Sequence, residues 1–334
     1  MNYATYKQFR DEVLGEKCPL RLDCMNPVQA LADWAKRPEW EQPLPTGPMG
    51  AVDAWSRATR IILDREKTVV ALGVRDLLSA TFSCVQERNQ ELWLPEDVYP
   101  IYWELAKHTD VRARAFTTLP RPDWTFLAQT GECAAVLVPA PLSPVGRLPT
   151  DAEIDALFRW LRGSRRRLLI IDAVYTFDFS VGRALSDSLL ADNQCLVLWS
   201  CSKSWLYPGV LGLAQVPASL APGLRSRVSL PSDIEVGRVI AMLEGRPDLP
   251  RMQQEAFDRE WRRLAPCLRS ASPDWQPPAT GYFSVVSAPF MRLLEEHGIL
   301  SVPATVFGSR RNDLSIVTCL HDLVANSAGN NFKI

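Results

Sequence analysis

Short apolar runs that do not alternate with polar residues recur through the middle of the chain, and they constrain its fold most strongly. They predict strands at residues 68–73, 91–95, 133–139, 168–172 and 195–200, with a sixth candidate at 210–217. Helix-like segments lie between them at 74–89, 99–108 and 149–163. Strands that are apolar on both faces are typical of a parallel sheet covered by helices. The sequence therefore predicts an α/β fold with a mainly parallel sheet.

The last third of the chain has a different pattern. A long helical stretch at 233–270 is followed by strand-like segments at 281–288 and 314–320, which predicts a smaller α+β domain. A chain of 334 residues is long enough for two such domains. We expect three parts: an N-terminal segment that packs with the small domain, a large domain and a small C-terminal domain, at residues 1–45, 46–220 and 221–334.

Composition argues against several classes of function. The formal net charge of -1 does not favour a general nucleic-acid or anionic-membrane binder. The basic run Arg165–Arg167 is interpreted as a solvated helix end. Eight cysteines without a C-x-x-C pair and only three histidines predict no metal site. A polar N-terminus and the lack of a long apolar run favour the reducing cytoplasm.

Two of the predicted strands end in groups that suit one kind of chemistry. LLIID ends at Asp172, and CLVLWS runs into Ser-Cys-Ser-Lys, which ends at Lys203. Neighbouring parallel strands end at the same edge of a sheet, so both groups are expected to face one ligand. A lysine can form a Schiff base with a carbonyl cofactor, and a carboxylate keeps a pyridine nitrogen protonated. Pyridoxal phosphate uses such a ring as an electron sink.

The lysine segment SCSKSWLYPG resembles the S-x-S-K-x-x-x-x-P-G motif of class I/II aminotransferases, which are fold type I pyridoxal-phosphate enzymes, and DAVY resembles their D-x-x-Y motif. The resemblance implies that Lys203 is the Schiff-base lysine. It implies that Asp172 pairs with the pyridine nitrogen and that Tyr175 bonds the ring hydroxyl. It also implies the fold type I architecture, with a mainly parallel, helix-covered sheet in the large domain and a smaller α+β domain.

Four further segments match the family in the expected order, so the resemblance runs from about residue 20 to about residue 320. PEDVYPIY is similar to P-x-Y-P-x-Y, VPAPLSPVGRLP to N-P-x-N-P-T-G, and GILSVPATVFG to G-[IV]-x-V-x-P-G-x-x-F-G. ALGVRDLL resembles the turn and helix that hold the cofactor phosphate. These matches imply further cofactor contacts from Tyr99, which would stack on the pyridine ring, and from Gly73, Val74, Arg75, Ser143 and Ser200.

The sequence also departs from the family. Leu211 replaces the usual phosphate-binding arginine, and Arg75 is a candidate substitute. Asp313 stands where an arginine usually binds the substrate α-carboxylate. Either Arg310 or Arg311 reaches in from the preceding loop, or the substrate presents an amine or guanidinium to Asp313, or Asp313 is only a turn residue. The segment WEQPLPTGPMG lacks the tyrosine that often crosses to the partner subunit's phosphate.

These observations predict a pyridoxal-phosphate enzyme that transfers an amino group between an amino acid or amine and a 2-oxo acid or related carbonyl, in specialised metabolism. The loss of the carboxylate arginine leaves open a lyase, decarboxylase or cyclase that acts on an amino acid with a basic side chain. The loss of the phosphate arginine leaves open a non-catalytic descendant with the same fold. The resemblance implies a homodimer, and no nucleic-acid or membrane partner is expected.

Overall fold

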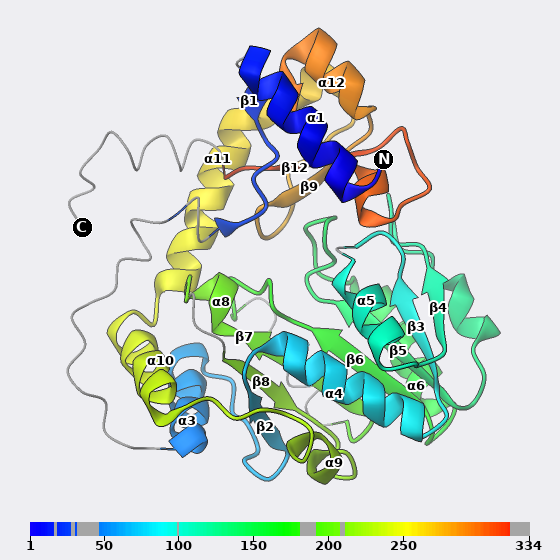
Figure 1. Cartoon of the computed structure of the whole chain (residues 1–334), viewed down its shortest axis with the longest axis vertical. Coiled ribbons are helices and arrows are strands. Elements are labelled where there is room, and N and C mark those ends of the chain that lie inside the picture. The colour runs from blue at the N-terminus through cyan, green and yellow to red at the C-terminus, as the bar shows by residue number, and fades with distance from the viewer. Residues whose placement is uncertain are drawn as a thin grey trace.

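The computed structural model describes residues 1–16, 19–27, 31, 47–98, 100–180, 192–207 and 211–320. Figure 1 shows a helix-covered sheet in the lower half of the view and a smaller lobe above it, with helix α11 (Leu249–Ala271) running from one to the other. None of the helices in the described ranges is long and apolar enough to cross a membrane.

Within the described residues, the large sheet has seven strands in the order β2-β8-β7-β6-β5-β3-β4. The strands are β2 (Thr68–Ala71), β3 (Glu91–Pro95), β4 (Ala113–Phe116), β5 (Ala134–Pro139), β6 (Leu168–Asp172), β7 (Cys195–Ser200) and β8 (Gly212–Gln215). Every neighbouring pair is parallel except that β8 runs antiparallel to both β2 and β7. The predicted mainly parallel sheet is thus confirmed. The sequence did not reveal β4, because this edge strand exposes two of its four residues.

Helices cover both faces of this sheet, which explains why its strands are apolar throughout. On one face, Ile171 and Val197 pack in a core with helices α3 (Gly47–Thr59), α6 (Asp151–Arg162) and α10 (Asp233–Gly245). On the other face, Ile170 and Leu196 pack with helices α4 (Val74–Glu87), α5 (Ile101–His108) and α9 (Ala221–Arg225). In Figure 1, α4 lies across the front of the sheet.

The smaller lobe has its own core and its own sheet, in agreement with the α+β prediction. Strands β11 (Val302–Pro303), β12 (Ser315–Thr318) and β9 (Phe283–Val286) form an antiparallel sheet in that order. Helix α12 (Phe290–His297) packs in the same core as α11. The helix expected at 233–270 is interrupted between α10 and α11, where Pro247 lacks the amide hydrogen that a helix interior needs.

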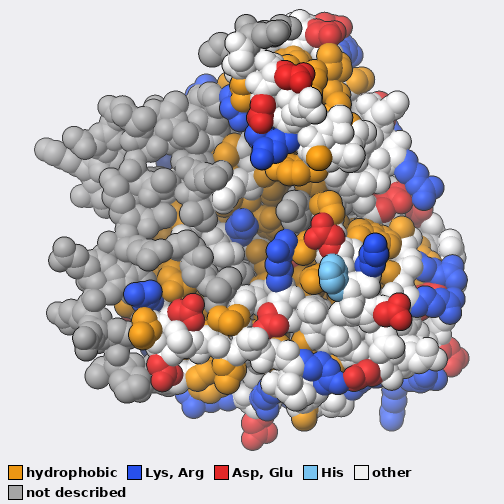
Figure 2. All heavy atoms as spheres, in the orientation of Figure 1, with side chains coloured by type: hydrophobic (Ala, Val, Ile, Leu, Met, Phe, Trp, Pro, Cys, Tyr) orange, Lys and Arg blue, Asp and Glu red, His pale blue; other side chains and the backbone are white. Residues whose placement is uncertain are grey.

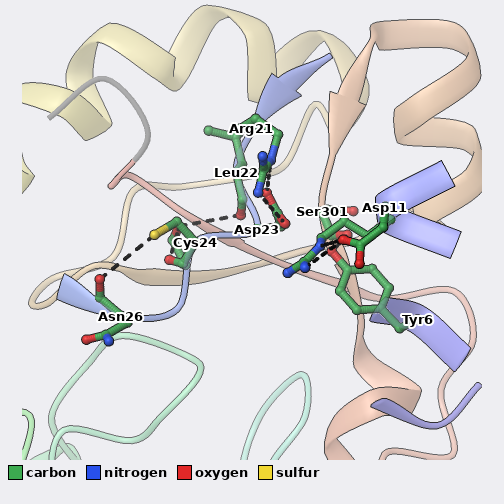
Figure 3. Close-up of polar contacts among 10 residues, drawn as sticks. Tyr6, Asp11, Arg21, Leu22, Asp23, Cys24, Asn26 and Ser301 are labelled. Atoms are coloured by element: carbon green, nitrogen blue, oxygen red, sulfur yellow. Dashed lines mark hydrogen bonds and ion pairs between the residues drawn. The ribbon is translucent and has the colours of Figure 1, made fainter. Parts of the chain in front are cut away.

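The start of the chain packs against this lobe (Figure 3). Strand β1 (Leu20–Arg21) pairs in parallel with β10 (Ile299–Leu300), and the amide of Thr318 donates to the carbonyl of Leu22 at 2.8 Å. The hydroxyl of Tyr6, in α1 (Tyr3–Glu16), donates to the carbonyl of Ser301 at 3.0 Å. The domain boundaries expected near residues 45 and 220 stay a prediction; α10 packs on the large sheet.

Charges of both signs are interspersed over the face shown in Figure 2, and hydrophobic side chains gather in the band between the large sheet and the upper lobe. Other short elements of the described residues are helix α8 (Cys201–Ser204) and two 3-10 helices, η1 (Trp124–Gln129) and η2 (Ala304–Phe307).

Candidate active site

The predicted acid and lysine follow adjacent parallel strands, as expected. Asp172 is the last residue of β6 and pairs in register with Leu198 of β7. Lys203 lies on α8, which begins directly after β7 ends. The hydroxyl of Ser204 donates to the carbonyl of Thr176 at 2.6 Å, so α8 is fastened to the segment that follows β6. The two groups therefore come from the same edge of the sheet.

Asp172 is a buried carboxyl group held by two hydrogen bonds. Only 8% of the residue is exposed, and it accepts hydrogen bonds from the Tyr102 hydroxyl at 2.7 Å and the Val174 amide at 3.1 Å. Burial raises the pKa of Asp172, and these hydrogen bonds oppose the rise. A cation placed beside this carboxylate would stabilise its charged form.

Sequence reasoning missed Tyr102. The residue lies in α5 and is buried, and its pKa is raised first by burial and then by the neighbouring Asp172. A signal was present in the sequence, because Tyr102 is the second tyrosine of PEDVYPIY, the motif used to predict the Tyr99 contact. Tyr99 itself lies outside the described residues.

Lys203 is half-buried, and burial lowers the pKa of its amine. Within the described part of the chain, its Nζ atom makes no hydrogen bond and no ion pair. A lowered pKa increases the fraction of neutral amine, which is the form that attacks a carbonyl group. The lysine is thus chemically suited to the predicted role.

The predicted phosphate-binding residues converge through the sheet register. Ala71 of β2 pairs with Gly212 of β8, and Gly212 pairs with Ser200 of β7. A Cβ atom on Gly212 would lie 2.6 Å from the carbonyl carbon of Gly73 and 2.8 Å from the amide nitrogen of Val74. The absence of a side chain at Gly212 therefore lets β8 pass close to the Gly73 turn, one strand away from Ser200.

This turn opens helix α4 without a side-chain cap. Gly73 has a φ of 97°, which favours glycine, and no side chain among the described residues caps the helix start with a hydrogen bond. The carboxylate of Asp76 in the first turn accepts a hydrogen bond from the Ser229 amide at 2.7 Å. The first backbone amides of α4 are thus available to an anion. Val74 begins the helix, and Arg75 is exposed.

Ser200 and Leu211 lie in the same region of the sheet as the Gly73 turn. The Ser200 hydroxyl accepts a hydrogen bond from the Ser202 amide at 3.0 Å and donates one to the Ser202 hydroxyl at 2.9 Å. Leu211 is only 1% exposed and belongs to the core on the α3 face of the sheet. The position of the family's arginine is therefore occupied by apolar packing.

Tyr175 and Ser143 line one small cavity together with residues of the upper lobe. Tyr175 makes edge-to-face contacts with Tyr282 and Phe283, at centroid distances of 5.9 and 5.6 Å. Burial and a hydrogen bond with Tyr175 raise the pKa of Tyr282. The site thus extends from the edge of the large sheet to the start of β9.

The three predicted substrate-binding residues lie on an exposed turn. The Arg311 guanidinium donates to both carboxylate oxygens of Asp313, at 2.7 and 2.5 Å. This ion pair lowers the pKa of Asp313 and raises that of Arg311. Arg310 lies 3.7 Å from the carboxylate of Glu96, and 86% of its side chain is exposed. Across the described residues, no hydrogen bond or ion pair joins this turn to Asp172 or Lys203.

A larger cavity of about 470 Å³ opens on the α3 face of the sheet. Ile171, Val197 and Trp199 form part of its wall, and none of the predicted site residues in the described ranges lines it. The cavity shares Pro141 and Thr280 with the small cavity that Tyr175 and Ser143 line.

Comparisons with known structures support the fold. The aspartate aminotransferase of Rhizobium meliloti matches with a TM-score of 0.73 at 17% identity, over 96% of this chain and 94% of that one. YbdL of Escherichia coli, described as having a methionine aminotransferase function, matches with a TM-score of 0.71 at 16% identity, over 98% and 95% of the two chains. A double mutant of the Thermus thermophilus aspartate aminotransferase gives 0.71 at 17%, over 97% and 95%. These likenesses show that the chain has the fold of the type I aminotransferases.

The sequence itself identifies the family. No curated protein matches the chain. The family model described as aminotransferase class I and II matches residues 51–323, which is most of the chain. This chain therefore belongs to the class I and II aminotransferase family of pyridoxal-phosphate-dependent transferases.

Proposed function

We propose that this enzyme transfers an amino group between an amino acid or amine and a 2-oxo acid or related carbonyl, and that Lys203 is its central residue. The observation that carries the proposal is the state of that lysine. It is half-buried, has a lowered pKa and has no partner within the described residues, and it follows the strand next to the one that ends in buried Asp172.

The residues present fit pyridoxal phosphate. The uncapped start of α4 follows β2 and offers backbone amides to a phosphate group. Ser200 ends β7, and β8 lies between that strand and β2. Asp172 is a buried carboxylate that a pyridinium nitrogen would stabilise. Because Leu211 supplies no charge, we propose that the phosphate is held by the helix start and by hydroxyl groups, with Arg75 as the nearest candidate cation in the sequence.

When bound, the cofactor supplies an electron sink for charge that develops at the substrate Cα atom. Lys203 would then be the base that removes the proton from the substrate Cα atom. Asp172, positioned by Tyr102, keeps the ring nitrogen charged. We propose that Tyr175 and Ser143, which line one cavity, donate hydrogen bonds to the ring hydroxyl. We propose that Tyr99 provides the stacking surface.

The first experiment is a peptide map of the purified protein after incubation with pyridoxal phosphate and reduction with borohydride. We expect modification at Lys203 and no more than traces elsewhere. Lys203→Ala should lose the modification, whereas Lys67→Ala should keep it, because Lys67 is a half-buried lysine close to Asp64 and lies away from the site. Modification spread over several surface lysines would contradict the proposal.

Asp313 favours a second candidate: a lyase, decarboxylase or cyclase that acts on an amino acid with a basic side chain. Asp313 already neutralises Arg311, so the turn offers no strong site for an α-carboxylate. An amino donor should convert a transaminase to its pyridoxamine form in the absence of an oxo acid, whereas the second candidate would release product without this change. An Asp313→Arg variant that improves turnover of simple α-amino acids would support the assignment of this turn to substrate recognition.

We also propose that the enzyme is a cytoplasmic homodimer. Cys24, Cys84, Cys133, Cys195, Cys201, Cys267 and Cys319 are free thiols, which suits a reducing compartment. Leu230 and Ile234 are large hydrophobic residues that are 63% and 56% exposed. They follow Ser229, whose amide donates a hydrogen bond to Asp76 in the first turn of α4. Exposed apolar side chains at this place suit a subunit interface next to the site. Sedimentation equilibrium should give twice the chain mass, and Leu230→Glu/Ile234→Glu should give the monomer.

A further inference from the structure

A basic pocket lies at the edge of the large sheet opposite to Lys203. It has a volume of about 280 Å³ and is formed where strands β3, β5, β6 and β7 begin. Arg88, Arg165, Arg166 and Arg167 line it, and none of its described lining residues is acidic. The sequence interpretation of Arg165–Arg167 as a solvated helix end does not account for the fourth arginine or for the pocket.

Two amide side chains hold the turn that carries three of these arginines. The Nε2 atom of Gln90, a residue only 5% exposed, donates to the carbonyl of Arg166 at 2.6 Å. The Nε2 atom of Gln194 donates to the carbonyls of Ser164 and Arg167, both at 2.8 Å. The backbone that presents the arginines is therefore fixed before any ligand arrives, which lowers the entropic cost of binding.

The four guanidinium groups differ in the hydrogen bonds that they make. Arg88 donates to the carbonyl and hydroxyl oxygens of Ser219 at 3.1 and 3.3 Å, and Arg167 donates to the carbonyls of Trp160 and Gly131. Within the described ranges, the guanidinium groups of Arg165 and Arg166 have no hydrogen-bond or ion-pair partner. Four positive charges around one pocket repel each other, and an anion bound among them would relieve that repulsion.

We propose that this pocket binds a small, multiply charged phosphate anion, such as a diphosphate or a phosphate monoester. One guanidinium group can bind a phosphate through two parallel N–H···O hydrogen bonds. Several guanidinium groups together suit a ligand with more than one negative charge. The pocket is a single open recess at a sheet edge, where Arg165 and Arg166 are exposed, and it does not form a long basic stripe, which favours a small ligand over a nucleic-acid strand. The site is separate from the cofactor phosphate site, which lies at the opposite ends of the strands.

Cys133 gives a direct reporter of occupancy, because it lines the pocket and its thiol lies 3.7 and 3.6 Å from the carbonyls of Arg88 and Asn89. The enzyme, loaded with pyridoxal phosphate and freed of excess cofactor, is alkylated with iodoacetamide with and without inorganic pyrophosphate. We expect pyrophosphate to slow alkylation of Cys133 about tenfold or more and to leave Cys24 and Cys267 unchanged. The cofactor absorbance should not change; a change would place the anion at the cofactor site and overturn the proposal.

Two charge-matched double variants test the arginines. Calorimetric titration with pyrophosphate should show about 100-fold weaker binding in Arg165→Ser/Arg166→Ser, at about tenfold for each lost charged contact. Arg238→Ser/Arg259→Ser removes two exposed arginines outside the pocket and should bind within twofold of the native protein. Equal weakening in both variants, or no slowing at Cys133, would overturn the proposal. Tighter binding of a single-stranded RNA oligomer than of pyrophosphate would overturn it in favour of nucleic acid.

Discussion

Two aspartates of this protein, both implicated by the sequence, have opposite surroundings. Asp172 is 8% exposed at the end of a central strand and accepts hydrogen bonds from a buried tyrosine and a backbone amide. Asp313 lies on a turn before β12 with 52% of its side chain exposed, and its partner is the nearby Arg311. The side of the site proposed for the cofactor is therefore fixed by the sheet. The side proposed for the substrate rests on an exposed turn that can change at little cost to the fold.

The largest expected effect comes from replacing each of the two aspartates by asparagine. Asp172→Asn should slow conversion of the cofactor by an amino donor about 1,000-fold, because a neutral amide cannot keep the pyridine nitrogen charged. Asp313→Asn should change the same rate by less than about threefold at saturating donor, because an exposed pair contributes little. Stopped-flow absorbance measures both. Losses of similar size would mean that the two residues share one role.

Gly212→Ala tests whether the proposed phosphate site at the Gly73 turn depends on the close approach of β8. The new Cβ atom would lie 2.6 Å from the Gly73 carbonyl carbon, so we expect a loss of about 1–3 kcal/mol in the free energy of unfolding and about tenfold weaker cofactor binding. Gly245→Ala is the matched control, since its Cβ atom would meet nothing within 4 Å. Urea unfolding and cofactor titration measure the two effects. A Gly212→Ala protein with native stability would show that β8 has room to move.

A third carboxylate, that of Glu153, sharpens the contrast between partly buried and exposed ion pairs. Burial raises the pKa of Glu153, but hydrogen bonds from Arg147, the Thr150 amide and Trp124 outweigh it and lower the pKa to about 2 from its ordinary value of 4.5. This stabilisation is complete above pH 4.5 and is lost as the pH falls toward 2.

Glu153→Gln should therefore reduce the free energy of unfolding by about 2 kcal/mol at pH 7, a value discounted for partial solvation of the pair. The difference from the native protein should shrink as the pH falls below 4.5. Asp313→Asn, which removes the exposed pair, should cost less than about 0.5 kcal/mol. Chemical denaturation across this pH range measures both, and a difference independent of pH would contradict the assigned ionisation.

A smaller effect than that of Asp172→Asn should come from each of two buried tyrosines. Tyr102→Phe removes one hydrogen bond to Asp172 and should slow the amino-donor reaction about tenfold. Tyr6→Phe removes the hydrogen bond to the Ser301 carbonyl and should cost about 1 kcal/mol of stability without changing that rate. A native rate in Tyr102→Phe would show that the Val174 amide alone positions Asp172.

The sequence by itself determined the framework of this protein and its family. The apolar runs predicted six strands of the large sheet, because strands buried on both faces leave no polar alternation. The polar residues that end two of those runs, with their motifs, indicated the aminotransferase family that the family model confirms. Edge strand β4 escaped prediction because its half-exposed residues carry no such signal.

Only the tertiary structure decided which groups meet. Strand β8 runs antiparallel, and this direction brings Gly212 against the Gly73 turn, a contact between residues 139 positions apart that no local pattern encodes. The hydrogen bond from Tyr102 to Asp172 and the pairing of Arg311 with Asp313 likewise depend on side-chain positions in space. A sequence motif specifies which chemical groups are present. Packing then decides which of them are buried together and which neutralise each other at the surface, because burial and pairing are properties of the folded chain.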